Sequence, residues 1–563
     1  MDPNPDLDRF DSRRSTAYAQ DGMVATSQPL AAQAGVEALR EGGNAFDAAV
    51  TTAAVLNVVE PMSTGIGGDA FALYRTADGD VGAFRSCGGA PAEATIETVR
   101  ERVAERSGVD PSAASMPGAG PLAVTVPGSA RGWERLVEDH GNRSLAAALD
   151  PAVEYAREGF PVSEVIADMW TTGEALFTEE DARGEYLLDG RSPEPGEVMT
   201  LPDLGETLET VATEGADAFY EGPLADRIAE AVRDRGGLLA ADDLADFEPE
   251  YVDPVSTTYR GAEVYELPPN NQGLVALEAL NVAEELDAGG YDYDSPERVH
   301  YFAEALKRAF HDGHHYITDP EFEDVPALGS KAYAAERAAT VGERAGSVSI
   351  GGPGAPGDGD TVLLTVADEA GNVVSFINSI FGNFGSGVVV PGTGITLQNR
   401  GSSFSLDSDH PNRIEPGKRP FHTLIPGLCR FADDDWAAFG VMGGYMQPQG
   451  HLQVLSNLLD YGMPLQAALD APRWRYREDG SLAVEDRFPD GLLPKLARRG
   501  HDVTVRPPGD FGGGQITRLA EASSRGRRSP GRTGRRRASN PRFARASARG
   551  TRRYRRRRRR RRW

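Results

Sequence analysis

Residues 361–379 form a β-hairpin pattern that begins abruptly after a stretch rich in Gly, Pro and Asp. The segments TVLLTVA (361–367) and VVSFINS (373–379) are apolar and β-branched, and DEAGN between them is typical of a turn. If Ala367 pairs with Val373, Thr361 lies directly opposite Ser379, with the two Cβ atoms about 5 Å apart. We therefore expect two hydroxyl groups to lie side by side at the open end of the hairpin.

The position of Thr361 at this junction allows a specific chemistry. A threonine hydroxyl is a weak nucleophile near neutral pH and needs a base. Cleavage of the Asp360–Thr361 bond would supply one, because the new α-amine has a reference pKa near ~8. A flexible linker, predicted over residues 345–360, would let the two new ends separate. Taken alone, the local pattern favours a loop followed by an ordinary strand that begins with Thr.

Helical patterns dominate before the linker and strand patterns dominate after it. The stretch PLAAQAGVEALREGGNAFDAAVTTAAVLNVVEP predicts two helices separated at Gly42–Gly43, and the second is so uniformly apolar that it should be buried. Residues 125–310 predict mostly amphipathic helices, whereas 361–515 predict mostly strands. This order favours an α+β fold or a layered sandwich.

Composition sets the expected environment of the chain. Its 563 residues contain no apolar window of 18 residues, so we expect no membrane association. The first residues have no apolar core of a secretory signal, and Cys87 and Cys429 do not make a disulfide framework. These features predict a cytoplasmic protein with reduced thiols.

The formal net charge is −26, but it is unevenly distributed. The last 43 residues contain 20 Arg and one acidic residue, which leaves a net charge of −45 on residues 1–520. A body this acidic repels itself unless salt screens its charges, so it is typical of halophilic proteins. The alternative is an acidic face for a cationic partner, although the acidic residues are spread along the chain.

Several long motifs resemble the γ-glutamyltranspeptidase family of N-terminal-nucleophile hydrolases. GGNAFDAAVTTAAVLNVVEPMSTGIGGDAFALY (42–74) resembles the family's large-subunit signature, and the hairpin with the residues after it resembles the start of the small subunit. PGKRPFHTLIP and GVMGGYMQPQGHLQVL also fit, so the resemblance runs from about residue 15 to 518. The fold it implies is α+β, a four-layer αββα sandwich.

The resemblance also implies roles for individual residues. The precursor would cleave itself before Thr361, giving a large subunit of residues 1–360 and a small subunit of 361–519. Thr361 would be the nucleophile, and Ser379 falls at the position of the hydroxyl that hydrogen-bonds it. Gly443 and Gly444 fall at the oxyanion hole, where backbone N–H groups approach the substrate carbonyl. The resemblance implies no metal and no organic cofactor.

The expected substrate-binding positions depart from the family pattern. Arg400 stands where the family has Gln or Glu, Ser403 stands at an Asp position, and Phe381 replaces an Asn. The family's carboxylate-binding Ser pair corresponds to His422 and Thr423. The family's large-subunit Arg usually stands four residues before a Pro, whereas Arg85 stands six residues before Pro91.

A cationic Arg400 would repel an α-ammonium group and attract a carboxylate. These changes resemble the acylase-like branch of the family, whose members can hydrolyse glutaryl amides. The alternative is that Arg400 is a surface charge paired with an acid.

We therefore expect a self-processing amidohydrolase or acyltransferase that acts on γ-glutamyl or glutaryl-like amides through an acyl-enzyme on Thr361. Its partner would be a small-molecule amide, with no nucleic acid involved. Two alternatives remain open: a strict γ-glutamyl transferase or glutathione hydrolase, and a degenerate member that is not an enzyme.

Residues 520–563 depart from the rest of the chain. Family members usually continue with strands after a GGGQ-like element, which here occupies residues 512–515. The composition instead changes to Arg, Ser, Gly and Pro, as happens when a GC-rich gene is read out of frame. We expect this tail to be disordered; the alternative is a basic arm that binds nucleic acid.

Overall fold

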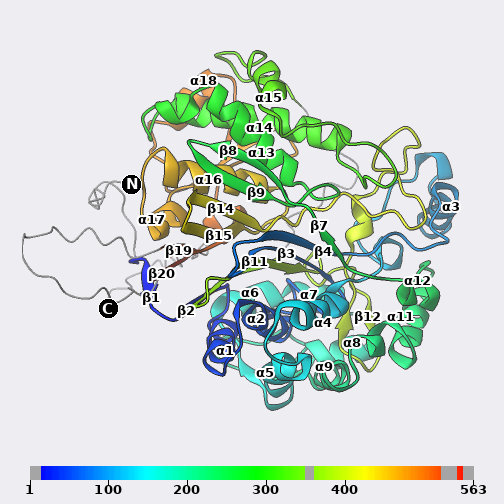
Figure 1. The fold of residues 1–563 in the computed structure, drawn as a ribbon. Helices are drawn as coiled ribbons and strands as arrows, with labels where there is room; N and C mark the ends of the chain where they lie inside the picture. The colour runs from blue at the N-terminus through cyan, green and yellow to red at the C-terminus, as the bar shows by residue number, and fades with distance from the viewer. Residues whose placement is uncertain (1–13, 349–360, 521–541, 549–563) are drawn as a thin grey trace, which may run out of the picture.

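The computed structural model describes residues 14–348 and 361–520, together with the backbone of 542–548. Two β-sheets pack face to face, and helices cover the outer face of each sheet (Figure 1). This arrangement is the predicted α+β fold with four layers, αββα.

The six-stranded sheet contains the predicted hairpin at its centre. In sheet order its strands are β2 (Gly22–Ala25), β10 (Val362–Asp368), β11 (Val373–Ser379), β3 (Asp69–Arg75), β4 (Val81–Ser86) and β7 (Glu250–Val252). Its outer face packs on α1 (Pro29–Arg40), α2 (Ala45–Val59) and α4 (Ser129–His140); further out, α5 (Leu145–Glu158) packs on α2, and α9 (Pro202–Glu214) packs on α5. All 15 residues of α2 are buried, which confirms the prediction made from its uniform apolar pattern.

The seven-stranded sheet forms the other inner layer. In sheet order its strands are β1 (Ala17–Ala19), β20 (Arg542–Ala548), β19 (Gly514–Ala520), β15 (Asp435–Val441), β14 (Gly427–Ala432), β9 (Ala262–Glu266) and β8 (Val255–Tyr259). Its outer face packs on α13 (Gly273–Glu285), α16 (Met446–Leu459) and α17 (Leu465–Asp470), and α14 (Pro296–Tyr316) packs on the outside of α13.

The remaining elements lie around these layers. The helices are α3 (Ile96–Ser107), α6 (Glu164–Trp170), α7 (Thr172–Leu176), α8 (Glu180–Tyr186), α10 (Asp217–Tyr220), α11 (Pro223–Arg233), α12 (Ala241–Ala245), α15 (Lys331–Ala338) and α18 (Leu493–Arg498). The strands are β5 (Phe160–Pro161), β6 (Val198–Met199), β12 (Val389–Val390), β13 (Ile395–Thr396), β16 (Trp474–Tyr476), β17 (Ser481–Glu485) and β18 (Asp502–Arg506).

The two faces of β10 enter two different cores. Val362, Leu364 and Val366 pack toward the helices, whereas Leu363 and Ala367 pack between the sheets. Successive side chains of a strand point to opposite faces, so odd-numbered residues of β10 face the second sheet. Thr361, with the same parity, is thereby directed into the space between the sheets.

The predicted linker begins later than the sequence indicated. Residues 345–348 are held by the body, because the Ala345 N–H donates to the Arg499 carbonyl at 2.8 Å and the Tyr476 hydroxyl donates to the Val348 carbonyl at 2.7 Å. The other linker positions, 349–360, lie outside the described residues.

The predicted absence of structure in the Arg-rich tail needs a correction at one segment. Residues 542–548 form β20, which pairs with both β19 and β1. Strand pairing uses backbone groups, so it needs little apolar surface from the added strand. Residues 521–541 and 549–563 lie outside the described residues.

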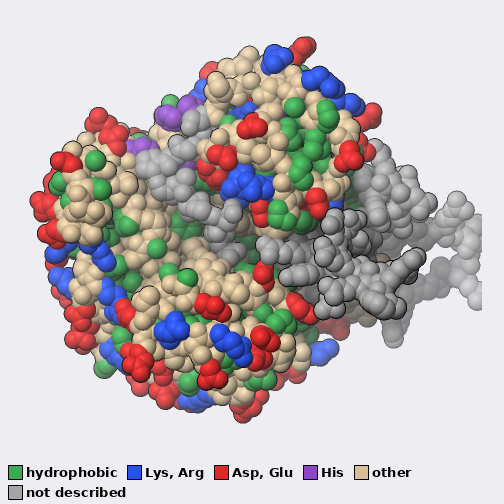
Figure 2. Space-filling model, turned by 180° about the vertical axis from the view of Figure 1, so that it is seen from behind, with side chains coloured by type: hydrophobic (Ala, Val, Ile, Leu, Met, Phe, Trp, Pro, Cys, Tyr) green, Lys and Arg blue, Asp and Glu red, His purple; other side chains and the backbone are tan. Residues whose placement is uncertain are grey.

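The face of the molecule drawn in Figure 2 carries acidic and basic side chains together. Figure 2 shows Asp and Glu side chains scattered over one face of the molecule, with Lys and Arg between them. In the described ranges, no helix combines the length and apolar character needed to cross a membrane. Cys87 and Cys429 are both buried and free.

Candidate active site

The hairpin register predicted from the sequence is confirmed. Val362 pairs with Asn378 and Ala367 pairs with Val373, so Thr361 lies opposite Ser379. The Thr361 hydroxyl donates to the Ser379 Oγ at 3.3 Å, and Thr361 is 5% exposed. A threonine at the start of a central strand is thus held against a second hydroxyl.

A polar row continues from this pair across the sheet. Ser379 pairs with Asp69 on β3, and Ala70 pairs with Ser86 on β4, which places Cys87 beside Asp69. Both Asp69 and Cys87 are buried. Because neighbouring strands are about 4.8 Å apart, Asp69 lies roughly 10 Å from Thr361 along the row.

Asp69 binds a neutral histidine. The Leu424 N–H donates to Nδ1 of His422 at 3.3 Å, so the ring proton is on Nε2, which donates to the Asp69 carboxylate at 3.1 Å. Burial raises the pKa of Asp69 to about 7, although Arg400 opposes this shift. Burial also lowers the pKa of His422 well below its ordinary value, with Arg400 and Arg85 adding to the effect.

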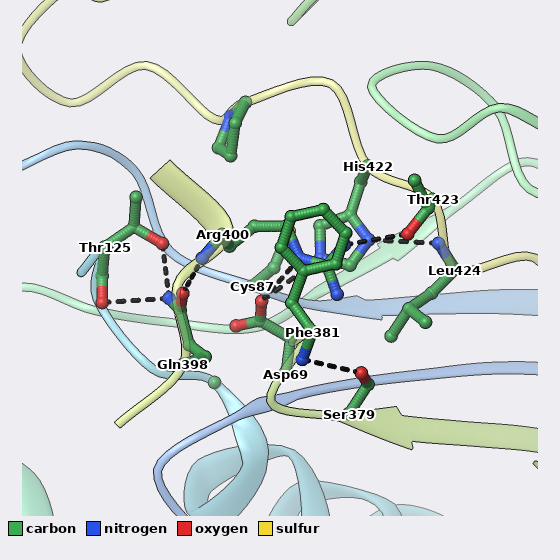
Figure 3. Close-up of polar contacts among 12 residues, drawn as sticks. Asp69, Cys87, Thr125, Ser379, Phe381, Gln398, Arg400, His422, Thr423 and Leu424 are labelled. Atoms are coloured by element: carbon green, nitrogen blue, oxygen red, sulfur yellow. Dashed lines mark hydrogen bonds and ion pairs between the residues drawn. The ribbon is translucent and has the colours of Figure 1, made fainter. Parts of the chain in front are cut away.

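Arg400 is buried, which contradicts the surface-charge alternative. Its Nη1 donates to the Thr423 hydroxyl at 2.8 Å, and its Nε lies 3.8 Å from the Asp69 carboxylate (Figure 3). The Nε and Nη2 groups have no hydrogen-bond partner among the described residues. Burial lowers the pKa of Arg400 to about 10, which leaves it charged at neutral pH. Nε faces the Asp69 carboxylate, so Nη2 is the donor of this buried cation that is available to a further anion.

Two contacts between the sheets show how β10 faces its neighbours. The Thr365 and Thr517 hydroxyls lie 2.8 Å apart, and Thr517 pairs with Ala438 of β15. Two residues further along each strand, Leu363 faces Gly440, since a Cβ placed on Gly440 would lie 2.7 Å from the Leu363 Cδ2. Descending residue numbers on β10 thus face ascending numbers on β15.

The same register brings Thr361 to the level of Met442 and Gly443. Gly443 and Gly444 form the turn between β15 and α16, with φ of +110° and +56°, a region that favours glycine. The Met446 N–H donates to the Gly443 carbonyl at 2.9 Å. This turn lies directly after the end of β15, the strand whose register reaches the level of Thr361.

The other predicted binding residues differ in their surroundings. His422 and Thr423 join Arg400 at the site, whereas Ser403 is buried at the end of the 3₁₀ turn η4 (Arg400–Ser403) and no hydrogen bond of its side chain connects it to Arg400. Arg85 lies near enough to lower the pKa of His422, but its Nη1 and Nη2 already donate to Pro269 and Glu250. It is less available to a substrate than Arg400.

The sequence reasoning missed Asp69 and Gln272. Asp69 begins the strand DAFALYR and is followed by five residues without charge, and that pattern could have indicated a buried carboxylate. Gln272 ends the amide-rich stretch PPNNQ just before α13, where polar side chains can reach neighbouring loops.

A separate cluster has the composition of a metal site but not free ligands. His300, Glu304 and His501 lie close together and are buried. Nδ1 of His300 contacts His501 at 2.9 Å and its Nε2 contacts the Gly342 carbonyl at 2.9 Å, while Glu304 binds Lys307 at 2.7 Å. A metal ion would have to displace these bonds.

Comparisons with known proteins agree with this architecture. A sequence model of the family described as gamma-glutamyltranspeptidase matches residues 31–539. The glutathione hydrolase-like YwrD proenzyme of Bacillus subtilis (strain 168) is 39% identical over 501 residues, covering 86% of this chain and 91% of that protein. The acylase ACY 1 proenzyme of Pseudomonas sp. (strain SE83) is 36% identical over 520 residues, covering 91% and 92%.

A solved structure extends the similarity to the whole fold. Cephalosporin acylase from Bacillus halodurans matches with a TM-score of 0.84 at 42% identity, and the match covers 97% of both chains. With a family match over most of its length and relatives well above 30% identity, the chain belongs to the γ-glutamyltranspeptidase family.

Proposed function

We propose that this chain cleaves itself between Asp360 and Thr361 and then hydrolyses or transfers acyl groups through Thr361. The observation that carries the proposal is the hydroxyl pair of Thr361 and Ser379 at the start of β10. The relatives named as proenzymes support processing of a precursor into two subunits.

The proposed reaction uses groups of the chain alone. The free α-amine of Thr361 takes the proton of its own hydroxyl while Oγ1 attacks the amide carbonyl. The N–H groups of Gly443 and Gly444 stabilise the oxyanion that forms. The proton passes to the leaving amine as the C–N bond breaks, which leaves an ester on Thr361. Water, deprotonated by the same α-amine, then releases the acid; an amine in its place gives transfer.

Arg400 favours an acyl group that ends in a carboxylate. Its Nη2 is buried and has no hydrogen-bond partner among the described residues, and a charge-assisted bond to a carboxylate is strong in such surroundings. A γ-glutamyl group would bring an α-ammonium toward the same cation, whereas a glutaryl group lacks it. The relatives named as acylases support an acyl group as the part of the substrate that is transferred.

The spacing of the polar row fits a five-carbon diacid. Arg400 lies beside Asp69, two strands or roughly 10 Å from Thr361. A glutaryl group spans about 5 Å between its carboxyl carbons. Contacts of roughly 3 Å at each end account for the rest.

Intact mass and anilide hydrolysis test both parts of the proposal. The wild type should give fragments of roughly 39 and 22 kDa in proportion to its 60.3 kDa, and Thr361→Ala should stay whole. The processed enzyme should have a higher kcat/KM for glutaryl p-nitroanilide than for γ-glutamyl p-nitroanilide. An uncut chain that hydrolyses anilides would refute self-processing, and an uncut, inactive chain would support the non-enzymatic alternative.

A glutathione hydrolase activity is the second candidate. The buried carboxylate of Asp69 favours it, because a carboxylate near the acyl site can receive an α-ammonium. A clear preference for the γ-glutamyl anilide that persists in Arg400→Gln would establish this alternative.

A further inference from the structure

Gln272 joins two loops of the candidate active site. It is fully buried just before α13, in the part of the chain that precedes the expected cleavage site. Its Nε2 donates to the Thr423 carbonyl at 2.6 Å and to the Gly444 carbonyl at 3.1 Å. Its backbone N–H donates to the His422 carbonyl at 3.0 Å.

The orientation of this amide follows from its partners. Two carbonyl oxygens can only accept, so the NH₂ group must face them. The Oε1 atom has no hydrogen-bond partner among the described residues. The side chain therefore acts on its surroundings as a donor.

The two carbonyls belong to peptides at opposite ends of the expected substrate. Thr423 accepts from Arg400 through its hydroxyl, at the place proposed for the acyl carboxylate. Gly444 belongs to the turn proposed to bind the oxyanion. A shift of either loop would change the distance between the anchor for the carboxylate and the point of attack.

We propose that Gln272 is a positioning residue that holds the Arg400–Thr423 loop and the Gly443–Gly444 turn at a fixed separation. The proposal rests on the proposed function of these two loops. It explains why a buried amide is placed where one of its polar atoms stays unpaired, a feature that otherwise costs stability. Substrates held at both ends should depend on Gln272 more than substrates held at one.

Two near-isosteric variants and one control test this role. Gln272→Met removes the donor. Gln272→Glu replaces it with a carboxyl group that, once ionised, can accept hydrogen bonds but cannot donate them. Asn281→Leu is the control, because Asn281 is a buried amide on α13, the helix that follows Gln272, and its hydrogen bonds go to Gly329 and Thr257.

We expect both Gln272 variants to lower kcat for glutaryl p-nitroanilide roughly 10- to 100-fold, as misplacement of a catalytic group does. With butyryl p-nitroanilide, which lacks the distal carboxylate, the same variants should lower kcat about twofold or less. A change of that size is within the deviation expected for independent sites. When Arg400→Met is already present, adding Gln272→Met should lower kcat for glutaryl p-nitroanilide by a further factor of about two or less. Equal losses with both anilides, or full additivity with Arg400→Met, would overturn the proposal.

Hydrogen exchange of the Thr361→Ala precursor separates this proposal from the proposed activity. Gln272→Met should increase exchange together in residues 422–425 and 443–447, whereas Asn281→Leu should leave both loops protected. This result supports the connection between the loops even if no anilide is hydrolysed, in which case only the proposed activity fails. Unchanged exchange in either loop rejects the role of Gln272 whatever the activity.

Discussion

The guanidinium carbon of Arg400 lies 3.8 Å from the centroid of the Phe381 ring, so a buried cation rests on an aromatic face. Phe381 has a φ of +78°, a conformation that is unfavourable for an aromatic residue. Its N–H donates to the Ser379 Oγ at 2.8 Å. One strained residue thus contacts both the proposed carboxylate anchor and the hydroxyl beside Thr361.

Removing the ring should weaken binding of an anionic acyl group. Phe381→Leu should raise KM for glutaryl p-nitroanilide roughly 3- to 10-fold, because a cation–π contact is worth about 0.5–2 kcal/mol. Phe381→Tyr keeps the ring and serves as the control. Steady-state kinetics would contradict the stacking role if the two variants had the same KM.

Loss of the Ser379 hydroxyl should slow self-cleavage. Ser379→Ala removes the acceptor for Thr361, and we expect the precursor to persist roughly 100 times longer on denaturing gels. Ser375→Ala is the matched control, because Ser375 lies on the same strand and donates to the Phe439 carbonyl at 3.0 Å. Similar cleavage rates in the two variants would exclude a specific role for Ser379.

Asp69 should make stability depend on pH. Its pKa is about 7 in the folded protein and near the ordinary value of 3.8 when unfolded, so the folded state holds the proton more tightly. The contribution of this carboxyl group to the free energy of unfolding is fully present below about pH 4 and is lost as pH rises toward 7. Asp69→Asn keeps an acceptor for His422 and removes the titration. Between pH 4 and 7 the wild type should therefore lose urea resistance relative to the variant; parallel curves would contradict this.

Salt should stabilise the acidic body. The distance over which salt leaves charges unscreened shortens from about 10 Å at 0.1 M to about 3 Å at 1 M, which weakens the repulsion among the excess acidic residues. We expect Tm to rise steadily from 0.1 to about 2 M KCl. Sucrose, which favours the compact state without screening, separates this effect from solute exclusion. A Tm that responds to sucrose but not to KCl would argue against adaptation to high salt.

The strand β20 leads to opposite expectations for two deletions. Removing residues 521–563 takes away the strand between β1 and β19 and exposes the edge of β19, so Tm should fall. Removing only 549–563 keeps β20 and should leave Tm unchanged. Equal Tm values for both truncated chains would show that β20 adds nothing to stability.

The parts of the site that the sequence could predict are those set by local pairing. The Thr361–Ser379 contact follows from a five-residue turn and two strands adjacent in the chain, so their register could be counted. Fold class followed from the order of helical and strand patterns together with the family motifs.

Residues whose environment depends on distant packing could not be predicted in this way. Arg400 was open to interpretation as a surface charge, and only its packing against Phe381, Asp69 and Thr423 shows that it is buried. Gln272 reaches Thr423 and Gly444 across about 150 and 170 residues of chain, a separation at which no local pattern operates. Pairing of β20 likewise depends on an open sheet edge elsewhere in the fold.

Strands from both sides of residue 361 alternate within the six-stranded sheet. The hairpin β10–β11 lies between β2 and β3, which both come from the part before the linker. The pair β10–β11 separates β2 from the other three strands of the earlier part, so a break before Thr361 leaves two interlocked polypeptides. Folding must then come first and cutting second, and fragments made separately should not reassemble as readily as the whole chain folds. The cleaved protein would therefore have a fold that forms readily only while the two parts are one chain.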